Sequence, residues 1–232
     1  MEKKQRMEVL MRLLQFTDSA LPVGTFSFSN GLETAVHEGI VHDADTLQRY
    51  VGTMVRQAAL SDGVAALHAH RAACRRDMEA LVLTDAALLR SKMNEESRLM
   101  LRRMGRKLAE LALAVLPHEW LADWIEAVKL GDSPGCYPVA QGVVFALAGM
   151  DEEQLFASHQ YGVAGMMLGA ALRCIKVSHY DTQAILYRQA AATRDLYEEV
   201  RHYALDEMQA FMPQADILAS LHEKGRMRMF MN

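Results

Sequence analysis

The chain has 232 residues, of which 51% are hydrophobic and 23% charged, and its formal net charge is −4 at pH 7. This composition excludes a wholly disordered protein, and the slight excess of acids offers no general attraction to nucleic acid or to anionic membranes. The three cysteines are an odd number in a chain too large to need disulfide staples. We therefore expect reduced thiols and a cytoplasmic protein.

Two further features bear on membranes and secretion. Charged residues, Glu8 and Arg12 among them, interrupt the apolar residues near the N-terminus, and a secretory leader does not tolerate this. The most apolar stretch, residues 163–172, ends at Arg173 and is far shorter than the roughly 20 residues that cross a bilayer. We expect neither a leader nor a transmembrane helix.

Residues 18–33 do not fit a plain helical bundle. Pro22 and Gly24 favour a turn, two phenylalanines follow in a loop, and Ser29 or the asparagine after it can cap the helix that comes next. The segment is either a loop packed on the core or a binding loop, because loops on a rigid scaffold often carry recognition.

The middle of the chain predicts an amphipathic helix with one apolar face. Its apolar residues recur at helical spacing: Leu101, Met104, Leu108, Leu111 and Val115. Between residues 90 and 107 the basic residues exceed the acidic ones by five. This stretch contains no aromatic residue on which a base could stack, so we interpret it as a solvated charged face and expect no nucleic-acid binding.

Turn residues divide the rest of the chain. Breaks are expected at residues 22–24, at residues 131–135, at Gly149 and at Pro213. Residues 170–212 contain neither glycine nor proline, which predicts one long helix or two in series.

Residue choice favours helices throughout. Ala, Leu and Met far outnumber the β-branched residues, and no run alternates as a strand would. The sequence therefore predicts an all-α, single-domain bundle of about ten helices over residues 1–212, followed by a tail over residues 213–232. The tail is basic and apolar near its end, so we expect it to be disordered alone and to become ordered on a partner.

The common catalytic motifs are absent, including the phosphate-binding loop, the dinucleotide-binding glycine motif, the zinc-protease helix and the serine-hydrolase elbow. We predict no catalytic residue, no cofactor and no resident metal. The residues leave open an α-helical enzyme or metalloprotein that uses Cys136, His159, Cys174 or His179. Among these, Cys136 lies in a turn-rich segment and is expected to be the more accessible thiol.

The segment from Asp18 to Glu33 resembles the N-terminal motif of the urease accessory protein UreF family. That motif runs approximately Asp-x-x-x-Pro-Ile/Val-Gly-Gly/Ser-Phe/Tyr-Ser/Thr-His-Ser-x-Gly-Leu-Glu. Residues 172–173 with 183–186 provide a second match, and residues 228–232 are similar to the family's closing Arg-Leu-Phe-x-Ser. Phe28 replaces the family's histidine, so no polar or metal-directed role is carried over to that position.

The resemblance implies a non-enzymatic assembly protein that forms homodimers, binds UreD, and with it recruits the GTPase UreG that brings nickel to apo-urease. Nickel would be cargo of the complex, not a cofactor. A pair of glycines, Gly165 and Gly169, would let another helix approach closely, and packing within one subunit is the favoured role for them. The resemblance and the loop chemistry predict these partner-binding residues: Phe26, Ser27, Ser29, Gly31, Arg228 and Phe230.

Overall fold

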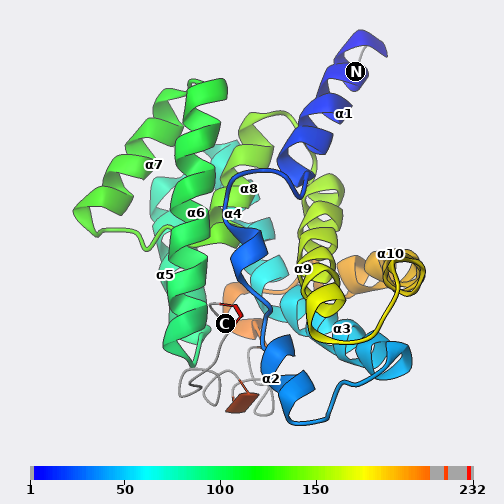
Figure 1. The fold of residues 1–232 in the computed structure, drawn as a ribbon. Coiled ribbons are helices and arrows are strands. Elements are labelled where there is room, and N and C mark those ends of the chain that lie inside the picture. The colour runs from blue at the N-terminus through cyan, green and yellow to red at the C-terminus, as the bar shows by residue number, and fades with distance from the viewer. Residues whose placement is uncertain (1–2, 210–216, 219–228, 231–232) are drawn as a thin grey trace.

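The computed structural model describes residues 3–209, 217–218 and 229–230. These residues form helices joined by turns and loops and no strand, which confirms the predicted all-α fold of about ten helices (Figure 1). The α-helices are α1 (Lys3–Thr17), α2 (Leu32–His37), α3 (Ala44–Ala58), α4 (Val64–Arg75), α5 (Met78–Ser91), α6 (Glu95–Val115), α7 (Glu119–Leu130), α8 (Tyr137–Leu147), α9 (Glu152–Cys174) and α10 (His179–Val200). The short elements are 3-10 turns at Thr25–Ser27 and Leu205–Glu207 and a π-helical turn at Ala59–Gly63.

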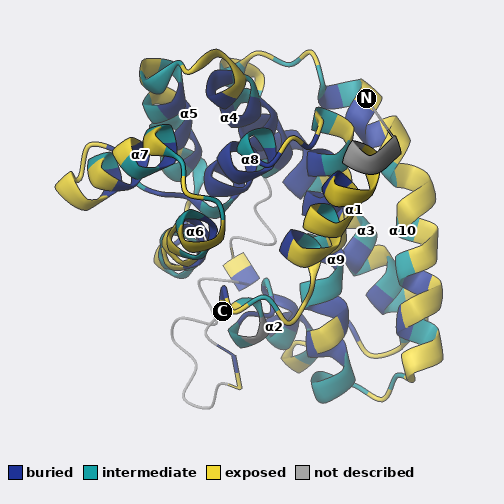
Figure 2. Cartoon of the chain, turned by 90° about the horizontal axis from the view of Figure 1, so that it is seen from above, coloured by how far each residue is buried: buried dark blue, intermediate teal, exposed yellow. Residues whose placement is uncertain are grey.

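Helix α8 is the centre of the first core. Its side chains are almost all buried, and it packs between α4 and α6 (Figure 2). Gly142 makes the close contact with α4, because a Cβ at that position would lie 2.5 Å from the carbonyl oxygen of Ala66. The core around α8 includes Trp124 of α7 and Phe145 of α8 itself.

A second core lies between α3, α9 and α10. Val51 and Val55 of α3 pack with Met167 of α9 and Ile185 of α10. At the other end of α10, the rings of Phe156 and Tyr197 lie 5.5 Å apart, and their tilted arrangement is favourable for aromatic pairs. The fold thus buries two adjacent apolar clusters along one chain.

The stretch from residue 170 onward forms two helices in series. Helix α9 ends at Cys174, and α10 begins after Ser178, whose hydroxyl accepts the backbone N–H of Asp181 while the Asp181 carboxylate accepts the N–H of Ser178. This reciprocal cap satisfies backbone donors that would otherwise lack partners at the start of α10. The break therefore needs neither glycine nor proline.

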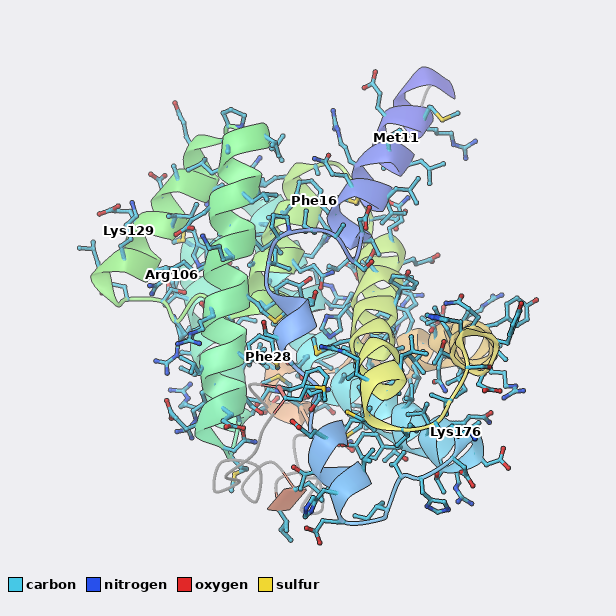
Figure 3. All side chains as sticks on the ribbon, in the orientation of Figure 1. Met11, Phe16, Phe28, Arg106, Lys129 and Lys176 are labelled. Atoms are coloured by element: carbon cyan, nitrogen blue, oxygen red, sulfur yellow. The ribbon has the colours of Figure 1, made fainter. Side chains whose placement is uncertain are left out.

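Helix α1 is anchored on one side only. Val9 and Phe16 are buried in the first core, whereas the opposite face of the helix is exposed (Figures 2 and 3). Within the described residues no helix has the length and the apolar character that crossing a bilayer requires. Residues 210–216 lie outside the described residues, so the domain boundary at 212/213 stays a prediction.

Candidate protein-interaction surface

The segment from residue 18 to residue 33 is held to the protein by its apolar side chains. Phe28 is only 4% exposed and Ser29 is fully buried, so this part of the segment belongs to the interior (Figure 3). Gly24 and Gly31 have φ values of +95° and +78°, a region that glycine enters without strain. The buried position of Phe28 explains why a phenylalanine suits a site where the family motif has histidine.

Contacts to α3 and within the segment fix the start of α2. The Tyr50 hydroxyl donates to the carbonyl oxygen of Asn30 at 3.0 Å. A Cβ on Gly31 would meet the same hydroxyl at 3.0 Å, so this position favours glycine for space as well as for conformation. Ser29 accepts the backbone N–H of Glu33 at 3.4 Å, as expected of a capping side chain, although the N-cap position itself is Gly31.

The N-terminal segment meets the C-terminal end of the chain at Glu33. One carboxylate oxygen of Glu33 accepts the backbone N–H of Met229 at 2.7 Å, and the other accepts that of Phe230 at 3.1 Å. The guanidinium of Arg173 lies 4.1 Å from the centre of the Phe230 ring, within the range of a cation–π contact. Phe230 is only 5% exposed, whereas Met229 faces solvent. We call these four residues the terminal junction.

The junction brings together residues that lie at opposite ends of the sequence. Of the six predicted partner-binding residues, Ser29, Gly31 and Phe230 lie at or beside it, and Ser27 is half-buried in the preceding 3-10 turn. The side chain of Phe26 and the whole of Arg228 lie outside the described residues. The expectation that the tail packs only on a partner is wrong for Phe230, because Glu33 and Arg173 provide a site for it within the same chain.

A groove of about 360 Å³ runs beside α9 and α10, next to the N-terminal segment. Gly165 and Gly169 border it, and a Cβ added at either position would have no atom within 4 Å. The expectation that these glycines pack closely within one subunit is therefore wrong. Tyr161 of α9 lines the groove and is 45% exposed, whereas Tyr180 and Tyr187 of α10 are 87% and 83% exposed but do not line it. The groove therefore offers small residues and an exposed aromatic one side by side.

Comparison with known proteins identifies the family. The UreF family model matches residues 41–190. The chain is 48% identical over 96% of its length to urease accessory protein UreF 2 of Brucella canis, covering 92% of that protein. It is 43% identical over 96% of its length to urease accessory protein UreF of Yersinia pseudotuberculosis serotype IB, covering 98% of that protein. The chain belongs to the UreF family. The resemblance seen in the sequence is thus confirmed.

The alternative set of cysteine and histidine residues does not form a common site in this UreF-family chain. Cys136 is fully buried, and burial raises the pKa of its thiol, so the expectation of an accessible thiol is wrong. Cys174 is half-buried and its thiol pKa is also raised, chiefly by burial. No three His, Cys, Asp or Glu side chains among the described residues are grouped so that they could hold a metal ion.

His159 belongs instead to a buried polar cluster next to the π-helical turn. Its Nδ1 is 3.0 Å from the side-chain oxygen of Gln141, and burial lowers the pKa of the imidazole. Nearby, Asp62 and Lys92 form an ion pair at 2.5 Å with side chains only 13% and 17% exposed. Burial alone would raise the pKa of Asp62, but Lys92, His159 and the hydroxyl of Ser61 outweigh it, so this pKa lies below its ordinary value.

Sequence reasoning predicted only Phe230 of the four residues of the terminal junction, and it missed Met229, which contributes its backbone N–H, as well as Glu33 and Arg173. Glu33 fits a helix first turn, where an acid is common, and Arg173 fits the last turn of α9, where a base is common. Both thus have ordinary local explanations that conceal their contact with the C-terminal residues. A usable hint was that Glu33 closes the N-terminal motif of the family.

Proposed function

We propose that this chain is a non-enzymatic urease accessory protein that binds UreD and, together with it, recruits the GTPase UreG for nickel insertion into apo-urease in the cytoplasm. The observation that carries the proposal is the terminal junction, which brings together residues from the N-terminal, second and C-terminal matches to the family. Backbone donors of residues 229 and 230, the carboxylate of Glu33 and the ring of Phe230 fix this part of the surface in place. A surface held in this way loses little entropy on binding.

A sequential pull-down tests the proposal. The tagged chain is expected to retain UreD from a purified mixture, and to retain UreG only when UreD is present. Failure to hold UreD contradicts the proposed function. Stoichiometric metal that survives dialysis, or turnover of a small substrate without partners, would instead support the metalloprotein or enzyme hypothesis.

We further propose that the chain forms a homodimer through the groove beside α9 and α10. The glycines leave room for a helix of the second copy, and the exposed Tyr161 supplies rigid contact area of the kind enriched at interfaces. A two-fold interface uses the same patch on both subunits, and this groove with Tyr161 can contribute to it from each subunit.

Gly165→Leu is expected to convert the dimer into a monomer at micromolar concentration, because the new side chain fills space that the second copy needs. Sedimentation velocity measures the dissociation constant of the dimer. A tenfold increase in this constant corresponds to a loss of about 1.4 kcal/mol in association free energy. The variant should fold as well as the parent, since leucine is a better helix former than glycine and a Cβ at this position has no atom of the described residues within 4 Å. Ala114→Leu adds a leucine at an exposed position of α6 and should remain dimeric. A Gly165→Leu dimer as tight as the parent contradicts this interface.

A further inference from the structure

Helices α6 and α7 enclose a groove that the proposed function does not use. Helix α7 stands at the edge of the molecule beside α6 (Figures 1 and 2), and the space between them measures about 240 Å³. Ala109, Trp124, Ile125 and Val128 form an apolar floor, and Arg106 and Lys129 lie at its sides. The volume is below the roughly 300–1,000 Å³ of small-molecule pockets, so it suits one or two anchoring side chains.

A buried carboxylate holds one wall of this groove in place. Asp85 is fully buried and accepts the backbone N–H groups of Gly135 and Cys136 at 2.7 and 2.9 Å, together with the hydroxyl of Ser133. The indole N–H of Trp124 donates to the same hydroxyl at 3.1 Å, which ties α7 to the loop. The groove is therefore formed before anything binds, and little ordering opposes binding.

Glycine brings the loop and α6 together at this wall. A Cβ on Gly105 would lie 2.1 Å from the carbonyl oxygen of Gly135, so only glycine permits this approach. Both glycines line the groove, so their contact closes it on this side. The same loop thus contacts α5 through Asp85, α6 through Gly105 and α7 through Trp124.

Two of the three charged residues that line the groove, Arg106 and Lys129, are basic and the third, Glu110, is acidic, in a protein that is negative overall. Residues 98–107 contain five basic residues and no acid, whereas the whole chain has a formal charge of −4. Arg106 is exposed and makes no hydrogen bond or ion pair with any part of the chain that the structure describes. Lys129 contacts Glu126 at 3.1 Å in an exposed pair, and such pairs contribute little. Glu110 also borders the groove, but Lys107 lies 3.7 Å from it.

We propose that the α6–α7 groove docks an acidic amphipathic segment of a partner protein. An apolar side chain of the segment rests on Ile125 and Val128, and a carboxylate pairs with the guanidinium of Arg106, whose planar fork suits two parallel hydrogen bonds. A second carboxylate reaches Lys129. The apolar floor favours a protein over a nucleic acid, because Trp124 is fully buried and offers no ring face on which a base could stack.

Peptide binding to the full chain tests this assignment. The probe is a short labelled peptide with leucine and glutamate at helical spacing, and fluorescence anisotropy measures its affinity. Two matched peptides replace every glutamate by glutamine or every leucine by serine. The acidic amphipathic peptide is expected to bind at least about tenfold more tightly than either, since binding needs both the charge and the apolar contact.

Charge reversal on the protein locates the site. Arg106→Glu should weaken the acidic peptide about tenfold or more, whereas Lys176→Glu makes the same charge change at an exposed position far from the groove and should leave the affinity unchanged (Figure 3). Circular dichroism confirms that both variants fold. Any of three results overturns the proposal. They are an equal loss of peptide affinity in the two variants, equal binding of the three peptides, and tighter binding of a thymidine oligonucleotide of matched charge.

Discussion

Replacing Lys92 by methionine is expected to lower the free energy of unfolding by about 3 kcal/mol at neutral pH. The change removes the cation that compensates the carboxylate of Asp62, and burial then opposes its charge. Breaking a buried ion pair by removing one partner costs about 3–5 kcal/mol. The lower end applies here because both side chains keep slight contact with solvent. Urea denaturation at pH 7 measures the loss.

The pH dependence identifies the cause of this loss. In the parent the pKa of Asp62 lies below its unfolded value of about 3.9, so the stability it contributes is complete above pH 4 and is lost as the pH falls through the folded pKa. In the variant, burial raises this pKa above the unfolded value, so stability declines as the pH rises through about 4. The difference in free energy of unfolding between the parent and the Lys92→Met variant should therefore shrink as the pH is lowered.

A double variant provides the control. Lys92→Met combined with Asp62→Asn removes the uncompensated charge and should recover more than half of the lost stability at pH 7. Two results would show that packing and not charge causes the loss. One is a loss of unfolding free energy in Lys92→Met that stays constant from neutral pH down to about pH 3, and the other is a double variant that is no more stable than the single one.

Local chemistry made three of the junctions between helices predictable. The predicted breaks at residues 22–24, at residues 131–135 and at Gly149 all separate helices in the structure, since proline and positive φ angles act within a few residues. The break before α10 was not specified in advance, because its cause is the cap between Ser178 and Asp181 and not a turn residue. These two residues lie three positions apart, a spacing that could have been recognised in the sequence as a capping motif.

Long-range contacts explain what sequence reasoning missed. Turn-rich surroundings suggested that Cys136 is accessible, but Asp85, 51 residues earlier, draws the loop inward through the backbone N–H of Cys136. In the same way, the N-terminal and C-terminal motifs were each recognisable, whereas their meeting depends on a bond between Glu33 and Phe230 across 197 residues. Neither contact could be predicted from hydrophobic periodicity or from motif spacing, because its partners lie far apart in the sequence.

Deleting residues 224–232 is expected to abolish capture of UreD and, through it, of UreG. The deletion removes the predicted partner-binding residues Arg228 and Phe230 and leaves the carboxylate of Glu33 without the two backbone donors of residues 229 and 230. Loss of the buried Phe230 ring should lower stability by about 2 kcal/mol. Both apolar cores lie chiefly within residues 1–209, so the truncated chain should still fold and dimerise. A pull-down with UreD and a thermal melt measure the two effects.

Point variants separate direct contact with the partner from support of the N-terminal segment. The contact that we propose for Arg228 is a buried charge-assisted hydrogen bond to UreD, so Arg228→Ala should weaken UreD binding by roughly 2–5 kcal/mol without lowering the melting temperature. Glu33→Gln keeps the shape of the side chain but removes its charge, so it should weaken the seating of residues 229 and 230 and lower the melting temperature slightly. Binding that falls only in proportion to stability, with Arg228→Ala unaffected, would mean that the tail acts by holding the N-terminal segment in place. Full UreD binding by the truncated chain would remove the tail from the interface altogether.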